Sequence, residues 1–569
     1  MKDIHYESHT IFERLEFLYP KEDITQAYEL ISKLIKKYKK RIKSTEYHLS
    51  EKDTILITYG DQLQQPGEMP LETLKLFLDT YLKGIINSVH ILPFYPYSSD
   101  DGFSVINYTE VDPKMGSWRD VEKISSEYRL MVDGVINHIS QSSDWFKGYL
   151  KGDERYSDFF VELDPTIDLS KVVRPRASPL LSEYLDDDGK IHNIWTTFSK
   201  DQVDLNYASY KVLAAVLEAL FVYVEKGATL IRLDAIAFIW KEIGTECVHL
   251  PQTHELIQLM REVLHEVAPE IIIITETNVP HKENISYFGS GEDEAQMVYN
   301  FALPPLLAHS IISGDTSKLT SWAKTLSLPS DKVCFFNFTA SHDGCGLRPA
   351  SGLLDDAEVD KLVANTESHG GLVSYRNTPE GKKPYELNCS FIDILSHPDD
   401  NNVIRAKRML LAQAATLAMP GVPGIYFHSL VGSRNYHEGV NLTGINRTIN
   451  REKCNYNRLV EKLQCEGSLE KMVFSAYRRL LSIRIHESAF NPFGEFEFLE
   501  IDKSIFAIMQ YSLDKEESIL ALHNFSNIDI TCSLPKSFQD PLKDLLSKSV
   551  IGVGKKIKLE PYQVMWLKK

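Results

Sequence analysis

The sequence lacks any apolar run that approaches the roughly 20 residues of a membrane-spanning helix. Its beginning, MKDIHYESHTIFERLEF, lacks the continuous apolar core of a secretory signal peptide. The seven cysteines lack CxxC or mixed Cys and His spacing, so nothing indicates a structural metal site. An excess of positive charge is also missing, because the formal net charge is −17, which argues against a nucleic-acid binder. We therefore expect a cytoplasmic protein with reduced thiols and no membrane partner.

The chain of 569 residues is too long for one compact domain of ordinary size. One large core with insertions and appendages fits this length better. The apolar fraction of 43% is ordinary for a globular protein. Tyrosine and phenylalanine are plentiful, with 27 and 26 copies, which suits a polyhydroxylated ligand as well as a core.

Eight short apolar segments are predicted to form strands, because each is rich in branched and aromatic residues and is bounded by turn formers or helical patterns. They cover residues 54–59, 88–92, 129–133, 228–232, 271–276, 297–301, 333–337 and 422–427. Helical patterns lie between most of them, as in YKVLAAVLEALFVYVEKG and VIRAKRMLLAQAATLAM. This alternation predicts an α/β fold built on a (β/α)8 TIM barrel.

Two irregular stretches interrupt the alternation, after the third and seventh predicted strands, and the end of the chain alternates in short strands such as SIFAIMQYS. Near the start, ITQAYELISKLIKKYKKRI predicts a solvated amphipathic helix with a basic face, with membrane or partner docking as the alternative. We divide the chain into an N-terminal helical extension (1–50), a first barrel part (51–138), an inserted domain B (139–203), a second barrel part (204–343), an inserted loop-rich domain B′ (344–400), a last barrel part (401–489) and a C-terminal antiparallel β domain (490–569).

Two charged residues, Arg232 and Asp234, interrupt the apolar segment ATLIRLDAIA. Because they are two residues apart, they point the same way from a strand. A charged pair on a buried strand is costly unless the charges are paired or used. Two interpretations are open for this segment alone: a nucleophilic carboxylate beside an arginine, or a structural ion pair.

Further polar side chains follow other predicted strands, and the C-terminal ends of barrel strands form the face that carries active sites. They are Asp133, Asn137 and His138 after the third strand, Glu276 at the end of the fifth, and His342 and Asp343 after the seventh. Each could be a helix cap, a core histidine or a turn residue. Independent turns and caps have no reason to recur at one rim, so we expect a common site.

Three carboxylates at one rim suggest glycoside chemistry. A retaining mechanism uses one carboxylate as nucleophile and one protonated acid, about 5–5.5 Å apart. Arg232 would favour the ionised form of Asp234. Glu276 follows the apolar run IIIIT, and apolar surroundings favour the protonated form that an acid needs.

The segments DGVINH, IRLDA, ITET and SHD, in this order, resemble the signature of the α-amylase superfamily, glycoside hydrolase family 13. QVDLN around Asp204 resembles a further motif of that family, and the resemblance covers most of residues 51–485. It implies that Asp234 is the nucleophile, Glu276 the general acid and base, and Asp343 the transition-state stabiliser. It also implies that Arg232, His138 and His342 hold the glucosyl ring.

Other segments resemble the sucrose-phosphorylase branch of the family. SSDDGFSVINYTEVDPKMGSW is similar to its aspartate–aromatic platform, which implies that Asp100 binds glucose hydroxyls and that Phe103 stacks on the ring. RPRASP resembles its basic acceptor loop, and HDGCGLRP with PYELN resembles its mobile loop. INREK places Arg451 where the branch has a ring-binding arginine. The calcium pattern of many amylases is not evident, so we expect no metal and no cofactor.

A phosphorylase of this branch needs an acceptor site that attracts an anion, and arginine suits bidentate contact with phosphate. The candidates for acceptor and phosphate binding are Arg174, Arg176, Arg376, Tyr385, Glu386 and Arg434. For Arg376 and Arg434 an ordinary surface charge is at least as good an explanation, whereas Arg176 is supported by the resemblance of its loop. Glu386 stands where the sucrose enzymes usually carry glutamine, which weakens the case for sucrose.

The additional segments FHSLVGSRN and TGINRTINREK look most like the glucosylglycerate phosphorylases of this branch. This resemblance implies reversible phosphorolysis of glucosylglycerate to α-D-glucose 1-phosphate and D-glycerate through a β-glucosyl-enzyme. The alternatives are a phosphorylase of sucrose 6′-phosphate, glucosylglycerol or sucrose, an α-glucoside hydrolase or transglucosidase, and a non-catalytic barrel scaffold. The expected partners are small molecules, and a homodimer is a candidate state of assembly.

Overall fold

Eight parallel strands close a barrel, and each of them coincides with a predicted segment. They are β1 (Ile55–Thr58), β3 (Ser88–Ile91), β4 (Arg129–Gly134), β9 (Ala228–Leu233), β10 (Ile272–Thr275), β11 (Met297–Tyr299), β12 (Cys334–Phe338) and β16 (Val422–Tyr426). Their order around the barrel is β1-β16-β12-β11-β10-β9-β4-β3. Nearly every side chain of these strands is buried, which explains their continuous apolar sequences. The predicted TIM barrel is confirmed.

The computed structural model describes residues 9–43, 47–176, 178–378, 381–534, 541–552 and 556–569. The chain divides into two compact units. Unit 1 comprises Met1–His48, Ile91–Thr277 and Ile285–Val298, and unit 2 comprises Leu49–His90, Asn278–Asn284 and Tyr299–Lys569. Each unit is described by itself below.

In unit 1, β9 pairs with β4 on one side and with β10 on the other. This register sets Asp133 of β4 and Ile274 of β10 beside Arg232. The helix α6 (Tyr210–Glu225) packs on β9. Its apolar residues occur almost all around its circumference, so it is buried on most sides.

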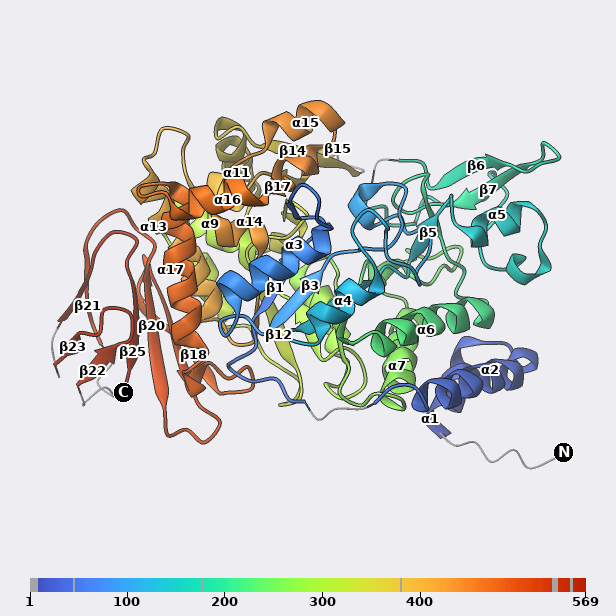
Figure 1. Ribbon diagram of the computed structural model, residues 1–569, viewed down its shortest axis with the longest axis horizontal. Helices are drawn as coiled ribbons and strands as arrows, with labels where there is room; N and C mark the ends of the chain where they lie inside the picture. Colours follow the sequence, from blue (N-terminus) through green and yellow to red (C-terminus); the bar gives the residue numbers. More distant parts are fainter. Residues whose placement is uncertain (1–8, 44–46, 177, 379–380, 535–540, 553–555) are drawn as a thin grey trace. The chain divides into compact units, whose positions relative to one another are not determined.

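Two N-terminal helices, α1 (His9–Leu18) and α2 (Lys21–Lys39), pack against α7 (Pro251–His265) and α6, respectively (Figure 1). The apolar face of α2 is buried. Its basic residues form ion pairs, with 2.5 Å between Lys37 Nζ and Glu218 Oε1 and 2.6 Å between Lys39 Nζ and Glu266 Oε2. The basic side chains are exposed, as expected for an amphipathic helix with a basic face, while the apolar face docks on its own chain. Exposed ion pairs add little, so the buried apolar face supplies most of the docking energy.

The insertion after β4 contains two small antiparallel pairs of strands and one short helix. These are β5 (His138–Ser140) with β8 (Gln202–Asp204), β6 (Leu181–Leu185) with β7 (Ile191–Trp195), and α5 (Asp144–Leu150). Trp195, Val172 and Leu180 form a local apolar core with Cys247. Within this insertion, β5 and β8 bring His138 opposite Asp204.

In unit 2, β1, β16 and β12 are adjacent, and α13 (Asn402–Leu417) packs against α17 (Leu469–Arg484). The insertion after β12 forms an antiparallel sheet in the order β13 (Cys345–Gly346), β15 (Gly381–Asn388), β14 (Leu372–Thr378). The helix α11 (Asp356–Ser368) packs on this sheet. The register places Gly346 opposite Glu386.

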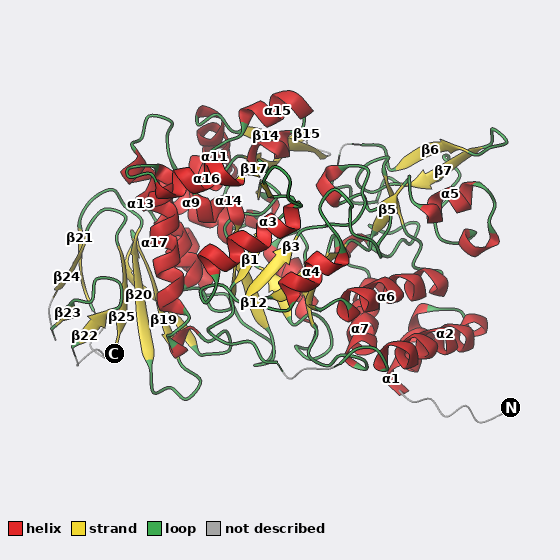
Figure 2. Cartoon of the chain, viewed as in Figure 1, coloured by secondary structure: helices red, strands yellow, loops and turns green. Residues whose placement is uncertain are grey.

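The end of unit 2 is an antiparallel β domain, as predicted (Figure 2). Its larger sheet runs β18 (Phe496–Asp502), β19 (Ile505–Tyr511), β20 (Ser518–Asn524), β25 (Val564–Lys568), β22 (Leu542–Asp544) and β23 (Val550–Ile551), and its smaller sheet pairs β21 (Ile530–Ser533) with β24 (Lys556–Leu559). Alternate residues of β19 point to the same face of the sheet. On one face they join the apolar core of this domain, through Ile505, Ala507 and Met509.

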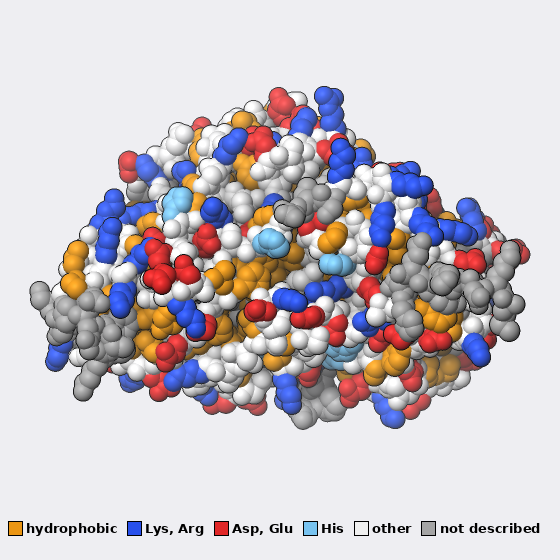
Figure 3. Space-filling view, turned by 90° about the horizontal axis from the view of Figure 1, so that it is seen from below, with side chains coloured by type: hydrophobic (Ala, Val, Ile, Leu, Met, Phe, Trp, Pro, Cys, Tyr) orange, Lys and Arg blue, Asp and Glu red, His pale blue; other side chains and the backbone are white. Residues whose placement is uncertain are grey.

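The described part of the chain contains no helix long and apolar enough to cross a bilayer. All seven cysteines lie in the described ranges, and all are free thiols. On the face drawn in Figure 3, acidic and basic side chains are interspersed.

Candidate active site

In unit 1, the buried side chain of Arg232 is surrounded by carboxylates from three neighbouring strands. Its Nη1 forms an ion pair with Asp133 at the end of β4 and lies 2.9 Å from Asp234 Oδ1. Its Nη2 lies 3.8 Å from Glu276 Oε1. The parallel register of β4, β9 and β10 produces this arrangement. Arg232 therefore forms an ion pair with Asp133 as well as with Asp234, and the role of the pair with Asp234 stays a prediction.

A strained turn links the two candidate catalytic carboxylates. Ala235 has a left-handed backbone with φ of +51°, which costs a non-glycine residue of order 1 kcal/mol. In this conformation its N–H donates to Glu276 Oε2 at 3.1 Å. The residue directly after Asp234 therefore fixes the orientation of Glu276. Arg232, 2.9 Å away, favours the ionised form of Asp234.

Asp204 is a fully buried hub beside this cluster. It accepts hydrogen bonds from the N–H and hydroxyl of Thr197 at 2.7 and 2.6 Å, and from Asn137 at 3.2 Å. Its counter-charge is Lys241, whose Nζ lies 2.9 Å from Asp204 Oδ2. The motif QVDLN thus supplies a satisfied buried charge that connects β8 with the segment after β4. Sequence reasoning missed Lys241, because no local pattern marks it.

His138 is buried and neutral. Burial lowers the pKa of His138 below its usual value, against an opposing effect of Asp204. Its Nε2–H donates to the carbonyl of Phe103 at 2.8 Å. The same carbonyl accepts a hydrogen bond from Gln202 at 3.1 Å. The hydrogen bond from His138 to Phe103 therefore helps to fix the position of the platform loop.

The platform loop has two consecutive left-handed residues, Asp100 (φ +52°) and Asp101 (φ +48°). Gly102 follows with φ of +108°, and a Cβ at this position would lie 2.5 Å from the carbonyl oxygen of Pro93. Only glycine fits here. This strained path carries the ring of Phe103 to 5.7 Å from the guanidinium of Arg232. Phe103 thus lies beside Arg232, whereas Asp100 Oδ2 lies 3.5 Å from Gln202 Nε2, and their roles as a platform stay predictions.

In unit 2, Arg447 bridges the third candidate carboxylate and a second buried one. Its Nη1 lies 2.5 Å from Asp343 Oδ1, while its Nε and Nη2 make two parallel contacts, at 3.0 and 2.6 Å, with Glu386. Glu386 is completely buried, and Asn388 also donates to it at 2.6 Å. Sequence reasoning missed Arg447, although it lies four residues before Arg451 in the segment INRTINR.

The backbone around Asp343 is held by the segment that follows Arg447. Asn450 donates to the carbonyls of Ser341 and Asp343 at 3.2 and 3.0 Å. Arg451 donates from Nε to the carbonyl of His342 at 2.7 Å, and its Nη2 lies 3.9 Å from Asp343 Oδ1. His342 Nε2 lies 3.5 Å from Asp343 Oδ2. Unit 2 therefore gathers His342, Asp343 and Arg451, three of the predicted site residues.

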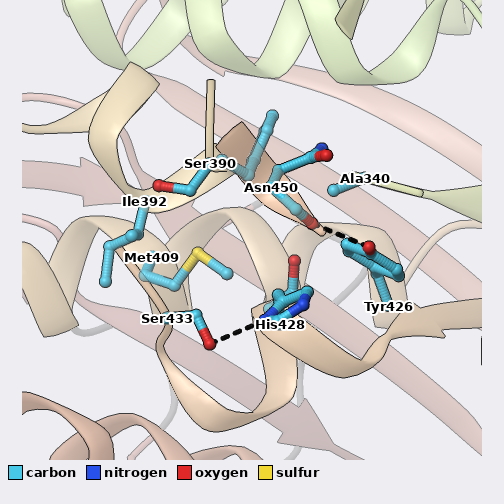
Figure 4. A pocket seen from close by; sticks show the side chains of 10 residues that line it. Ala340, Ser390, Ile392, Met409, Tyr426, His428, Ser433 and Asn450 are labelled. Atoms are coloured by element: carbon cyan, nitrogen blue, oxygen red, sulfur yellow. Dashed lines mark hydrogen bonds between the residues drawn. The ribbon is translucent and has the colours of Figure 1, made fainter. Parts of the chain in front are cut away.

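A small cavity lined by both polar and apolar side chains lies behind this backbone (Figure 4). Tyr426 donates to the carbonyl of Asn450 at 2.8 Å, and His428 Nδ1 lies 2.8 Å from the hydroxyl oxygen of Ser433. Burial lowers the pKa of His428 to about 3. His428 is therefore neutral near pH 7 and adds no charge to the Arg447 cluster.

The candidate acceptor residues have different surroundings. Tyr385 is buried, and its hydroxyl oxygen lies 3.4 Å from Asn278 Nδ2. Arg434 forms an ion pair with Asp393 and is 41% exposed. Arg174 is exposed and Arg176 is half-buried. Their loop includes Ala177, which lies outside the described residues, and the acceptor assignments stay predictions. The described residues include no group of His, Cys, Asp and Glu arranged to hold a metal ion.

Comparisons with known proteins agree with this architecture. The alpha-amylase catalytic domain model matches residues 75–343. The chain is 45% identical to the glucosylglycerate phosphorylase of Spirochaeta thermophila, with 98% of this chain and 97% of that protein covered. It is 44% identical to the glucosylglycerate phosphorylase of Escherichia coli, with 92% of each covered. The crystal structure of sucrose 6F-phosphate phosphorylase from Thermoanaerobacter thermosaccharolyticum has a TM-score of 0.74 at 24% identity, with 90% of this chain and 99% of that chain covered, and shares the fold.

Proposed function

Because the chain belongs to the α-amylase family, glycoside hydrolase family 13, we propose that it is a retaining glycoside phosphorylase that acts on glucosylglycerate. The products of phosphorolysis would be α-D-glucose 1-phosphate and D-glycerate. One observation carries this proposal: near-complete alignment, at 45% identity, with a glucosylglycerate phosphorylase. The Arg232 cluster supports it, since it holds two carboxylates, Asp234 and Glu276, directly after adjacent strands.

The proposed reaction proceeds by double displacement. Asp234 attacks the anomeric carbon while Glu276 donates a proton to the departing glycerate oxygen, and a β-glucosyl ester forms on Asp234. Phosphate then attacks the same carbon from the other face, and Glu276 takes its proton. Two inversions give net retention, so the product is α-glucose 1-phosphate. Asp343 stabilises the positive charge that develops on the sugar ring in both transition states.

The remaining residues would bind the substrate. We propose that the glucosyl ring is held by Asp100, Phe103, His138, Arg232, His342 and Arg451, and that phosphate or glycerate is held by Arg174, Arg176, Tyr385, Glu386 and Arg434. Glu386 acts on the acceptor through Arg447, since both oxygens of Glu386 face that guanidinium. Arg447 adds a cation to a site that must accept anions.

Three further assignments are also proposals. The sevenfold division of the chain that the sequence suggested serves as a working division into domains. Free thiols and the absence of a spanning helix in the described residues suit a cytoplasmic enzyme. A homodimer is the proposed assembly.

An acceptor screen tests the function. The purified enzyme is given glucose 1-phosphate with glycerate, glycerol, fructose or fructose 6-phosphate, and released phosphate is measured. We expect glycerate to give the highest kcat/KM. A preference for any of the other three would identify that compound as the acceptor, and the assignment as a phosphorylase would still hold. Equal release of free glucose from the glucoside with and without phosphate would instead indicate a hydrolase.

A further inference from the structure

A pocket of about 330 Å³ in unit 2 contains none of the residues assigned to the proposed reaction. The C-terminal β domain contributes Phe525, Asn527 and Tyr562 to its lining. The rest of the lining comes from the ends of α9 and α11, from the segment before α13 and from α13 itself. The volume falls at the low end of the roughly 300–1,000 Å³ typical of ligand pockets, so the pocket suits a small ligand.

The fixed charges of this pocket cancel. Among the described residues, one acidic and one basic side chain line it, and Asp400 Oδ2 lies 2.8 Å from Arg408 Nη1. Burial lowers the pKa of His369, whose Nδ1–H donates to the carbonyl of Asp393 at 2.7 Å. His369 is therefore neutral near pH 7, and its Nε2 is left as a hydrogen-bond acceptor. His397 lies beside it, with 5.4 Å between the two ring centroids.

The polar groups of the pocket are held in position by the surrounding chain. The N–H of His397 donates to Asp400 Oδ2 at 2.9 Å, and Arg405 Nε donates to the carbonyl of Asp400 at 2.7 Å. Arg408 Nε is buried and has no hydrogen-bond partner within the described ranges. A buried donor without a partner is costly, so a ligand oxygen that accepts its hydrogen bond would be favourable.

Tyr562 lies in the pocket with a strained backbone. Its φ is +58°, at the third position of the turn 560–563, in which the N–H of Gln563 donates to the carbonyl of Glu560 at 3.1 Å. Glycine or asparagine usually occupies this position, because a bulky side chain is strained there. The Arg408 guanidinium lies 5.1 Å from the centroid of the tyrosine ring. Backbone strain of this kind is concentrated at ligand-binding sites.

We propose that this pocket binds a neutral sugar. The apolar C–H face of a sugar ring would pack on the ring of Tyr562, which removes apolar surface from water. Sugar hydroxyl groups both donate and accept hydrogen bonds, and the pocket offers both kinds of partner. Arg408 Nε and the amide of Asn527 would donate, whereas Asp400 and His369 Nε2 would accept. An anion would find no net positive charge, because Asp400 cancels Arg408.

Hydrogen–deuterium exchange of the full chain, with glucose as the probe, tests the site. Exchange is measured by mass spectrometry for the segment 395–408, which lines the pocket, and separately for 228–237, which carries Asp234. The two segments keep this proposal and the proposed catalytic site distinguishable. We expect glucose to slow exchange of 395–408 in the wild type. In Tyr562→Gly, the glucose concentration that gives half of this protection should rise about tenfold or more, because the stacking surface is lost.

Glycine relieves the backbone strain at position 562, which favours folding of this variant. Lys548→Gly is the matched control, because Lys548 is an exposed residue of the same β domain with φ of +64°, and it should match the wild type. Asn527→Ala changes an exposed side chain, so it should fold, and it should raise the same glucose concentration about threefold.

Inorganic phosphate, an anion, should leave the exchange of 395–408 unchanged. Three results would overturn the proposal. The first is an absence of protection by glucose in the wild type. The second is identical protection in the wild type, Tyr562→Gly and Asn527→Ala. The third is protection by inorganic phosphate in place of glucose.

Discussion

Two arginine clusters carry the candidate chemistry, and they are built differently. Arg232 lies on a barrel strand and contacts carboxylates on its own strand and on both neighbouring strands. Arg447 lies on the 3₁₀ turn Asn446–Asn450 and bridges Asp343 and Glu386, which come from a loop and an inserted hairpin. The first cluster is set by strand register, whereas the second depends on the packing of loops. We therefore expect the first to govern the chemistry and stability, and the second to tune substrate use.

The largest effect should come from the strand-borne cluster. Asp234→Asn should lower glucosyl transfer about 10⁴-fold or more, because the amide cannot form the covalent ester. The fold should persist, since Arg232 keeps its partner Asp133. Glucose 1-phosphate formation measures the loss, with Asp187→Asn, an exposed position in the same unit, as the control. Appreciable glucosyl transfer by the purified Asp234→Asn variant would show that Asp234 is not the nucleophile.

The two arginines should differ in their effect on stability. Arg232→Met leaves Asp133 buried without its counter-charge and should cost about 3–5 kcal/mol of unfolding free energy. Arg447→Met should cost less, because Arg447 is 15% exposed and Glu386 keeps the hydrogen bond from Asn388. Urea denaturation of both variants measures the difference. If Arg447→Met lowers the free energy of unfolding more than Arg232→Met does, the cluster set by strand register does not contribute more to stability than the cluster set by loop packing.

Glu386→Gln should leave the fold intact but lower kcat/KM by about tenfold, because Arg447 then loses one counter-charge and binds Asp343 more strongly. The reduction should be similar with phosphate and with glycerate, since Glu386 is proposed to act on either acceptor through Arg447. Kinetics with glycerate and with phosphate check this. A loss of kcat/KM with glycerate but not with phosphate would show that Glu386 affects only the use of glycerate.

The smallest effect should be at the acceptor loop of unit 1. Arg176→Ala should raise the KM for phosphate about fivefold, with little change in affinity for the glucosyl donor, because one anion contact is removed. The exposed Lys171→Ala serves as the matched control. Steady-state kinetics with varied phosphate provide the measurement, and an unchanged KM for phosphate would argue against this loop.

The sequence predicted the structural features that depend on residues close together in the chain, and not those that depend on distant residues. All eight barrel strands were predicted, because a buried parallel strand is a short apolar run that can be recognised locally. The basic helix α2 was predicted as a helix but not as a docked one. Its partners Glu218 and Glu266 lie more than 180 residues away, and no local pattern indicates which acidic residues will face it.

The sequence by itself determined the barrel, the positions of Asp234, Glu276 and Asp343 at strand ends, and the family. These features depend on local patterning and on ordered motifs, which need no knowledge of distant contacts. Only the tertiary structure decided that Arg447 joins Asp343 to Glu386 and that Lys241 neutralises Asp204. Each of these contacts joins segments from separate elements, and a charge acquires its partner only when the fold brings those segments together.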